Sequence, residues 1–424
     1  MNSSSTSVVT FGGLGVSSWI ERNLRSAGIT KPTEIQEKCI PAALEGRDVL
    51  AAAQTGSGKT AAFAIPIVQR LQSDPYGVYA LCLTPTRELA LQITEQFTLI
   101  CTGTALQCKA IIGGEDMKAQ ATTLSSRPHI VCATPGRLME HLMFDHVIHS
   151  CFNKVASLVL DEADRLIDAG FDSEIRFILS KLPTTRQTLL FSATITPSIC
   201  AMKSMNLRNV LHVELQNYTP VENCKQQYCF VPSNMKDAYF FHILTKHLAS
   251  TTNSVIVFTN SIRSCELLHQ CCLQLDIKSV ALHSRKKQKQ REESLQLFRA
   301  LRIPVLIATD VASRGIDISQ VELVINFDTP SSVSNYIHRI GRTARAAHAG
   351  EAITLVTQHD VNRFLSIEIA TSQRMVEVKV SESEVSASLT QVLAAKRLAK
   401  LQLSQYFDTK TANRRVPRAS TRLN

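Results

Sequence analysis

Residues 49–60 read VLAAAQTGSGKT, an apolar run that leads into two glycines and a Lys-Thr pair. The run predicts a buried strand, and the residues that follow predict a helix. A glycine-rich turn between a strand and a helix is the context of a phosphate-binding loop, because backbone N–H groups and the helix N-terminus can cradle phosphate oxygens. The usual pattern begins with Gly, whereas this one begins with Ala53. We expect Lys59 to reach the β- and γ-phosphates and Thr60 to bind Mg²⁺. Considered alone, the loop is equally compatible with a plain glycine-rich turn.

A second apolar run, downstream, ends in acidic residues. Leu158-Val159-Leu160 is followed by Asp161-Glu162-Ala163-Asp164. An acid at the end of a buried strand can hold Mg²⁺, and a second acid beside it can take a proton from attacking water. Acids also favour helix N-termini, so a solvated acidic helix start is the alternative. The phosphate loop upstream favours the catalytic interpretation, with Asp161 as metal ligand and Glu162 as general base.

Short apolar runs alternate with helical patterns in two successive sets. The first set is 49–52, 79–83, 129–132, 158–160 and 188–191, and the second is 254–258, 278–282, 304–308, 323–326 and 352–356. Continuous apolar strands suit a parallel sheet buried on both faces, and their alternation with helices indicates βαβ units. The sequence therefore predicts an α/β protein with two tandem parallel-sheet domains.

The domain boundaries are predicted from changes in composition. Residues 216–223 are polar with a proline, so we place a linker at 217–227, a first domain at 1–216 and a second domain at 228–375. An amphipathic helical pattern covers 383–405, and residues 409–424 contain five basic residues and no acid. We assign 376–424 to a helical and basic tail whose end is expected to order only on binding.

The net charge of +10 is unevenly distributed. From residue 396 to the end there are eight Lys or Arg and one Asp, so this segment carries +7 and the preceding residues carry +3. The overall positive charge is therefore weak evidence for nucleic-acid binding, and the evidence must come from local groups of residues. No apolar run approaches the roughly 20 residues that span a bilayer, and the first ten residues lack a secretory pattern. The 12 cysteines form no Cys-x-x-Cys pair, which favours reduced thiols in an intracellular protein over zinc sites or disulfides.

Further motifs accompany the phosphate loop and the acidic segment in the order that one protein family shows. Together they make the chain resemble the DEAD-box RNA helicases over almost its whole length. The matching segments are Phe11, 28–36 (GITKPTEIQ), 53–60, 85–90 (PTRELA), Gly113-Gly114, 134–137 (TPGR), 161–164 (DEAD), 192–194 (SAT), 308–318 (ATDVASRGIDI) and 338–345 (HRIGRTAR). The resemblance implies two RecA-like domains that close on ATP and single-stranded RNA. It thus implies an RNA-stimulated ATPase that unwinds or remodels RNA or RNA–protein complexes.

The resemblance also implies a role for each motif residue at the ATP site. Gln36 reads the adenine edge, Phe11 packs on the base and Asp317 contacts the ribose. The remaining ATP contacts come from the loop residues Ala53, Gln54, Thr55, Gly56, Ser57, Gly58, Lys59 and Thr60. Mg²⁺ is held by Thr60 and Asp161. The catalytic groups are Lys59, Asp161, Glu162 and two arginine fingers from the second domain, Arg342 and Arg345.

RNA contacts are implied in both domains. In the first they are Pro85, Thr86, Arg87, Gly114, Thr134, Gly136 and Arg137, and in the second they are Gln288, Arg291, Thr309, Arg314 and Gly315. Contacts to phosphates carry little base specificity. Coupling of the ATP state to RNA binding is assigned to Ser192, Thr194, Asp164, His338 and Arg339.

The chain departs from the family pattern in two places. Ser284-Arg285 replaces the usual Gly-Asp after His283, and Ala346-Ala347 follows Arg345 where a Gly-Arg is common. The two arginine fingers are intact, so we expect activity to be retained. Within the family, segments 283–291 and 357–360 and the basic tail resemble the nucleolar helicases of small ribosomal subunit assembly. The expected partners are pre-ribosomal RNA and a protein activator, which the sequence does not identify.

Two other functions remain open at this point. An ATP-gated RNA clamp that nucleates a complex can keep every motif, and it differs from a helicase by slow phosphate release and long-lived RNA complexes. A DNA helicase of the same superfamily fits less well, because Gln36 and the Asp-Glu-Ala-Asp form indicate the RNA group. Comparing the stimulation of ATPase activity by RNA and by DNA distinguishes a DNA helicase from an RNA helicase.

Overall fold

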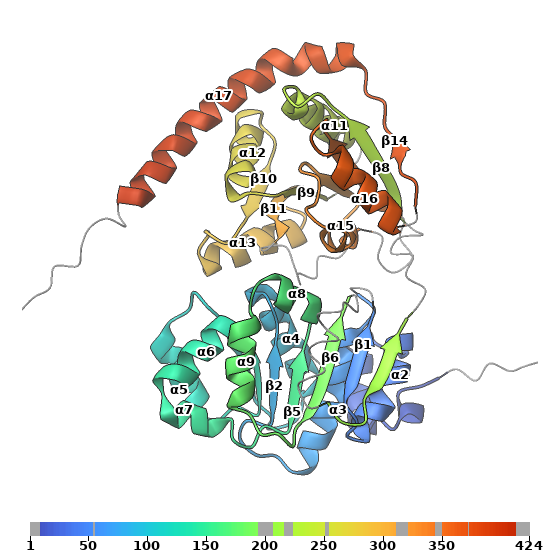
Figure 1. Ribbon diagram of the computed structural model, residues 1–424, viewed down its shortest axis with the longest axis vertical. Coiled ribbons are helices and arrows are strands. Elements are labelled where there is room, and N and C mark those ends of the chain that lie inside the picture. Colours follow the sequence, from blue (N-terminus) through green and yellow to red (C-terminus); the bar gives the residue numbers. More distant parts are fainter. Residues whose placement is uncertain are drawn as a thin grey trace, which may run out of the picture. The chain divides into compact units, whose positions relative to one another are not determined.

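The computed structural model describes residues 9–53, 56–193, 207–215, 224–250, 254–310, 321–343, 350–371 and 373–412, with side chains as far as residue 403 apart from that of Asp168. The chain forms two compact units that divide near residue 218 of the sequence. Each unit is a parallel sheet with helices on both faces (Figure 1). The predicted α/β class with two tandem parallel-sheet domains is confirmed.

The first unit contains a seven-stranded sheet in the order β3-β4-β2-β5-β6-β1-β7. Its strands are β1 (Val49–Ala52), β2 (Ala80–Leu83), β3 (Cys108–Ile111), β4 (Ile130–Ala133), β5 (Ser157–Leu160), β6 (Gln187–Ser192) and β7 (Leu211–Glu214). All pair in parallel, with Ala52 opposite Ser192. The carboxyl ends of these strands therefore lie along one edge of the sheet.

Two hydrophobic clusters cover the two faces of this sheet. Ala51 and Leu50, neighbours on β1, belong to different clusters because successive strand residues point to opposite faces. One face packs against η1 (Gly12–Leu14), α1 (Ser18–Ser26), α2 (Glu34–Leu44), α3 (Lys59–Ser73) and α4 (Arg87–Ile100). The other packs against α5 (Met117–Ser125), α6 (Pro135–Phe144), α7 (His146–Cys151), α8 (Ala163–Asp168) and α9 (Asp172–Ser180).

The second unit repeats this plan with the strand order β10-β11-β9-β12-β13-β8-β14. Its strands are β8 (Cys224–Phe230), β9 (Val255–Thr259), β10 (Ser279–Leu282), β11 (Val305–Thr309), β12 (Leu323–Asn326), β13 (Gly350–Val356) and β14 (Val376–Glu377). Its helices are α11 (Lys236–Ser250), α12 (Ile262–Gln274), α13 (Gln288–Arg299), α15 (Val333–Ile340), α16 (Val361–Thr371) and α17 (Glu382–Ala412). Cys229 packs in the cluster of α11, α12 and α17, whereas its neighbour Tyr228 packs against Phe364 of α16, with the two rings tilted by 48°.

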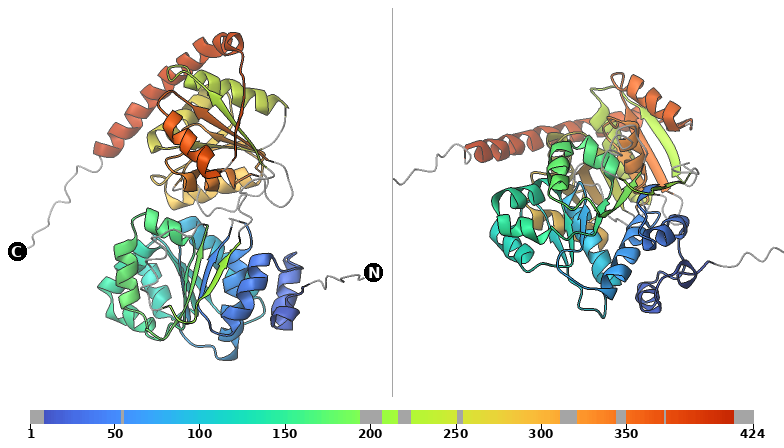
Figure 2. Two further views of the ribbon diagram at one scale, coloured as in Figure 1. Left: turned by 45° about the vertical axis from the view of Figure 1, so that its right-hand side comes forward. Right: turned by 60° about the horizontal axis from the view of Figure 1, so that its bottom comes forward.

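The long helix α17 belongs to the core of the second unit. Val385, Val392 and Ala399 are buried against α11 and α12 at near-heptad spacing, and Lys396 pairs with Asp237. Figure 2 shows α17 running along the outside of this unit. The packed core therefore continues beyond residue 375, where we placed the end of the second domain, and β8 begins inside the stretch that we assigned to the linker. Among the described helices, none is long and apolar enough to cross a membrane.

Candidate functional site

The predicted phosphate loop lies at the carboxyl edge of the first sheet, between β1 and α3. Gly56 and Gly58 have φ angles of 86° and 91°, a left-handed conformation that glycine adopts without strain. Ala53 is held to the neighbouring strand, since its N–H donates to the Ser192 carbonyl at 3.1 Å. Gln54 and Thr55 lie outside the described residues. The amino end of the turn is thus held to the sheet, where the strand end can direct its N–H groups at a phosphate.

Gln36 holds the last residue before α3. Its Nε2 donates to the Gly58 carbonyl at 3.0 Å, and its Oε1 accepts from the Thr33 N–H at 3.0 Å. A Cβ at Gly58 would clash with the Gln36 amide unless that side chain moved, and the φ of 91° is strained for any residue other than glycine. The structure therefore brings Gln36 to the phosphate loop. Phe11, the other predicted adenine contact, is fully buried in the hydrophobic core, and its contact with the base remains a prediction.

Lys59 and Asp161 belong to the same edge of the sheet. Lys59 is buried at the start of α3, and its Nζ donates to the Ala53 carbonyl. Asp161 directly follows β5 and is also buried. Burial raises the pKa of Asp161 to about 7, while the positive charge of Lys59 opposes this shift. A nearby cation would stabilise the ionised form of this buried carboxyl, which favours the predicted role of Asp161 as a metal ligand.

Glu162 has an unusual backbone conformation beside Asp161. Its φ is 50°, which is rare for a residue other than glycine and marks a strained position. Its Oε2 is buried and has no hydrogen-bond partner among the described residues, and the same holds for Ser57 Oγ. Orphaned polar atoms of this kind fit a site that is completed by a ligand or by water. Asp164 lies one turn further on and accepts from the Arg165 N–H at 3.0 Å.

The predicted RNA segments of the first domain follow three other strands of the same sheet. Pro85, Thr86 and Arg87 follow β2, Gly114 follows β3, and Thr134 follows β4. Thr86 is the N-cap of α4, where its Oγ1 accepts from the Leu89 N–H. The Thr134 N–H donates to the Ile111 carbonyl at 3.1 Å and so links the last two segments. Gly136, in the first turn of α6, has open space where a side chain would begin.

Arg87 lies directly against the glycine pair. A Cβ at Gly113 would lie 3.0 Å from the Arg87 guanidinium, and one at Gly114 would lie 2.4 Å from it. Arg137 donates to the Glu115 carbonyl at 3.0 Å and pairs with Glu140 at 3.0 Å. Both arginines therefore contact residues 113–115. The structure brings these predicted RNA contacts together on one turn.

The second domain places its predicted RNA residues at the carboxyl edge of its own sheet. Thr309 ends β11, and Gln288 and Arg291 lie in the first turn of α13, after β10. All three side chains are largely buried, and Gln288 donates to Glu292 at 3.1 Å. The predicted residues Arg314, Gly315, Asp317 and Arg345, like Thr194 of the first domain, lie outside the part of the chain that the structure describes.

Arg339 makes hydrogen bonds to three separate segments of the second domain. Its guanidinium pairs with both oxygens of Asp310, at 2.6 and 2.8 Å, and donates to the Asp328 carbonyl at 2.7 Å and to Asn260 at 2.6 Å. These partners follow β11, β12 and β9, so the arginine joins the ends of three strands. Our sequence analysis missed Asp310 and Asn260, because only the folded sheet brings these strand ends together. Arg342 is buried near His338, whose carbonyl accepts from its Nε at 3.2 Å.

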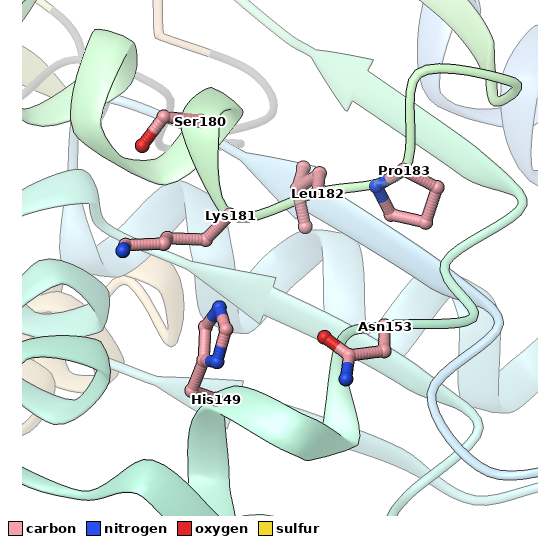
Figure 3. A pocket seen from close by; sticks show the side chains of 6 residues that line it. All are labelled: His149, Asn153, Ser180, Lys181, Leu182 and Pro183. Carbon is pink, nitrogen blue, oxygen red and sulfur yellow. The ribbon is translucent and has the colours of Figure 1, made fainter.

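A shallow pocket of about 330 Å³ lies elsewhere on the first unit (Figure 3). It is lined by His149, Asn153, Ser180, Lys181, Leu182 and Pro183. These residues precede β5 and β6, whereas the phosphate loop, the Asp161–Asp164 acids and the predicted RNA segments of the first domain follow strands. The pocket therefore lies at the amino edge of the sheet and contains none of the predicted site residues.

Comparisons with known proteins agree with this arrangement. The DEAD/DEAH box helicase family matches residues 33–202, and the helicase conserved C-terminal domain matches residues 236–347. The probable ATP-dependent RNA helicase DDX49 of Mus musculus is 45% identical over 412 residues, which cover 96% of this chain and 85% of that protein. This chain belongs to the DEAD-box ATP-dependent RNA helicases.

Other DEAD-box relatives match the chain over a similar extent. The ATP-dependent RNA helicase dbp8 of Schizosaccharomyces pombe is 42% identical and is matched over 93% of its length. Among solved structures, S. cerevisiae Dbp5 bound to RNA and ADP BeF3 has a TM-score of 0.80 at 28% identity, covering 91% of this chain and 99% of that one. Mss116p bound to ssRNA and AMP-PNP has a TM-score of 0.82 at 28% identity, covering 92% and 84%. The tandem RecA-like architecture of a DEAD-box helicase is thus confirmed over about nine-tenths of the chain.

Proposed function

We propose that this DEAD-box helicase uses ATP hydrolysis to unwind or remodel RNA locally during the processing of small-subunit ribosomal RNA in the nucleolus. The support for ATP-driven work on RNA is the family membership together with the motif geometry of both sheets. The support for the ribosomal role is the resemblance of residues 283–291 and 357–360 and of the basic tail to nucleolar helicases. A protein activator that promotes domain closure is part of this proposal.

The phosphate loop, Lys59 and Asp161 bind the triphosphate and its Mg²⁺. In proteins Mg²⁺ takes few side-chain ligands and completes its octahedron with phosphate oxygens and water. Thr60, in the first turn of α3, and Asp161 fit this pattern, because both supply oxygen and lie beside the loop. Bound Mg²⁺ would neutralise charge on the transferred phosphoryl group. Binding it requires Asp161 to be ionised, so binding of Mg–ATP should weaken as the pH falls below the pKa of about 7.

Glu162 accepts the proton of the attacking water. Glu162 directly follows Asp161 and has an unusual backbone conformation. Its buried Oε2 has no hydrogen-bond donor among the described residues, so this oxygen is available to accept a proton. Arg342 and Arg345 from the second domain act as fingers on the γ-phosphate, and Asp317 contacts the ribose. Because these groups belong to the second domain, catalysis depends on closure of the two domains.

The RNA backbone is bound by Arg87, Thr134, Arg137 and Thr309, together with the other predicted RNA contacts. Contacts with phosphates position a strand without reading its bases. Ser192 lies beside the ATP loop, because its carbonyl accepts from the Ala53 N–H, and this hydrogen bond connects the loop to the end of β6. Asp164 follows the acids Asp161 and Glu162 in the chain. Through these residues, with Thr194, His338 and Arg339, the ATP state controls the grip on RNA.

A single observation carries the proposal. The loop after β1, the acids after β5 and the RNA segments after β2, β3 and β4 all lie at one edge of one sheet. Ligands of open parallel sheets bind outside the carboxyl ends of the strands. ATP and RNA can therefore be bound by adjacent segments of the first domain.

Crosslinking the protein to RNA in cells and sequencing the attached RNA tests the proposed role. We expect precursors of the small-subunit ribosomal RNA to be enriched over an ultraviolet-free control. Enrichment of messenger RNA alone would contradict the ribosomal assignment but not the ATPase. Phosphate release that stays slow at saturating RNA, with long-lived RNA complexes, would instead identify an ATP-gated clamp.

A further inference from the structure

A buried amide connects two of the segments that we propose to grip RNA. Gln120 lies on α5, and its side chain is 4% exposed. It is one of two buried residues of this helix, the other being Leu124. A polar side chain in such a place is unfavourable unless its hydrogen bonds are made within the protein.

Both donors of the Gln120 amide point to the glycine turn. Nε2 donates to the Ile112 carbonyl at 2.9 Å and to Glu115 Oε2 at 2.8 Å. These two acceptors flank Gly113 and Gly114, against which Arg87 lies. The amide nitrogen thus fixes both ends of the turn.

Both acceptor sites of the amide are occupied from α6. Oε1 accepts from Arg137 Nη1 at 3.0 Å and lies 3.3 Å from His141 Nε2. Burial, followed by the charge of Arg137, lowers the pKa of His141. Because an amide oxygen can only accept, the contact with His141 is a hydrogen bond in which Nε2 carries the proton. The four hydrogen bonds that an amide can make are therefore all used.

We propose that Gln120 is a positioning residue that holds the glycine turn and Arg137 in a single arrangement ready for the RNA backbone. It does not touch RNA itself. Its oxygen shares the Arg137 guanidinium with the Glu115 carbonyl and Glu140, and its nitrogen restrains the turn that supports Arg87. Loss of the amide leaves each phosphate contact chemically intact but free to move relative to the next. The inference rests on the proposed role of these segments in RNA binding.

Gln120→Leu removes all four hydrogen bonds at nearly constant volume. We expect the RNA concentration that half-saturates ATPase stimulation to rise about tenfold, as for the loss of one to two hydrogen bonds. The rate at saturating RNA and the KM for ATP should stay within about twofold of wild type, because the ATP loop is not touched.

Gln187→Leu is the matched control in the same domain. Gln187 is also buried, donates to the carbonyls of Ala43 and Arg47 at 2.9 and 2.7 Å, and accepts from Arg70 at 2.9 Å, but it lies at the amino end of β6. We expect it to lower thermal stability without changing the half-saturating RNA concentration. An equal rise in both variants, or no rise in Gln120→Leu, would overturn the positioning role.

A charge swap keeps the test decisive if the leucine variant fails to fold. Gln120→Glu retains the acceptor for Arg137 but places a carboxylate against Glu115, so RNA affinity should fall. Adding Glu115→Gln restores a donor across that contact and should recover part of the loss. A double variant that binds RNA no better than the single one would overturn the proposal. Absence of any RNA stimulation in the wild type would instead defeat the proposed function itself.

Discussion

At the scale of single residues, Glu162 has the most specific assignment. Glu162→Gln keeps a polar side chain of the same shape beside Asp161 but removes the base. We expect ATP binding to change little and turnover to fall by about 10² to 10⁴-fold, the usual contribution of a general base. The variant should accumulate as an RNA-bound complex. Phosphate release at saturating RNA measures this, and a near-normal rate would remove Glu162 from the catalytic role.

Gln36 makes two hydrogen bonds that its sequence position alone could not reveal. It donates to the Gly58 carbonyl and accepts from the Thr33 N–H, and we propose that it also reads the adenine edge. Gln36→Ala should therefore weaken ATP binding and reduce the preference for ATP over GTP, because a site built to hydrogen-bond one base rejects another through those bonds. Competition of the two nucleotides for a fluorescent analogue reports the preference. Unchanged discrimination with weaker binding would assign Gln36 to loop support alone.

Motif residues were predictable from the sequence where their order and spacing are diagnostic. Lys59, Asp161 and Arg87 were assigned in this way, and the structure places them at one sheet edge. Gln120 carried no such signal, since an isolated glutamine in a short helix resembles a surface residue. Its importance appears only when β3, α5 and α6 pack together. Asp310 lies within the matching segment 308–318, but its pairing with Arg339 appears only when the ends of β9, β11 and β12 come together.

At the scale of secondary structure, the contact between α12 and β10 predicts a dependence of stability on pH. His269 on α12 lies 2.9 Å from Ser279 Oγ on β10. Burial, then the charge of Lys286, lowers the pKa of His269 to about 4, with His283 acting in the same direction and Glu266 opposing. Between pH 6.5 and about 4 the unfolded chain takes up the proton before the folded one, so stability falls as the pH falls through this window.

His269→Asn keeps a partner for Ser279 and removes the titration. The slope of unfolding free energy against pH should become shallower in that window, by at most about 1.4 kcal/mol per pH unit. Urea unfolding of wild type and variant at a series of pH values measures the difference. His359→Asn, at an exposed position of the same unit, is the control. Identical slopes for all three proteins would show that His269 is not buried as described.

Apolar strands were predicted well and strands that contain polar residues poorly, for a physical reason. Strands such as β5 and β9 are apolar throughout because both of their faces are covered. The edge strands β3 and β7 contain Lys109 and His212, and their side chains are partly exposed, so the apolar signal is diluted. In β8 the polar residues Lys225 to Gln227 hid a seven-residue strand. The amphipathic pattern at 383–405 did predict α17, which the structure extends to Ala412.

The basic segment at the end of the chain supports a prediction about RNA affinity. Residues 409–424 carry five positive charges and no acid. Deleting them should reduce RNA affinity and make the slope of log affinity against log salt shallower, because each neutralised phosphate releases a counterion. ATPase activity at saturating RNA should persist. RNA binding measured across a salt series, with and without the segment, tests this prediction. An unchanged slope would indicate that the segment serves only as a nuclear localisation signal.

At the scale of the whole molecule, one proposal joins the two units into one enzyme. The phosphate loop and the acids belong to the first unit, whereas the proposed fingers belong to the second. Neither unit alone holds a complete ATPase in this interpretation. Domain closure on RNA then becomes the event that starts hydrolysis. The dependence of the rate on a residue of the second unit is the direct consequence.

Arg342→Ala, assayed for phosphate release at saturating ATP and RNA, measures that dependence. We expect nucleotide affinity to fall only modestly and the rate to fall by about 10³-fold, as for the loss of an arginine finger. Thermal unfolding must remain close to wild type, since Arg342 is buried, and Arg363→Ala serves as the control at an exposed arginine of the same unit that pairs with Asp360. A rate within a few-fold of wild type, in a folded variant, would contradict the claim that the two domains complete one catalytic centre.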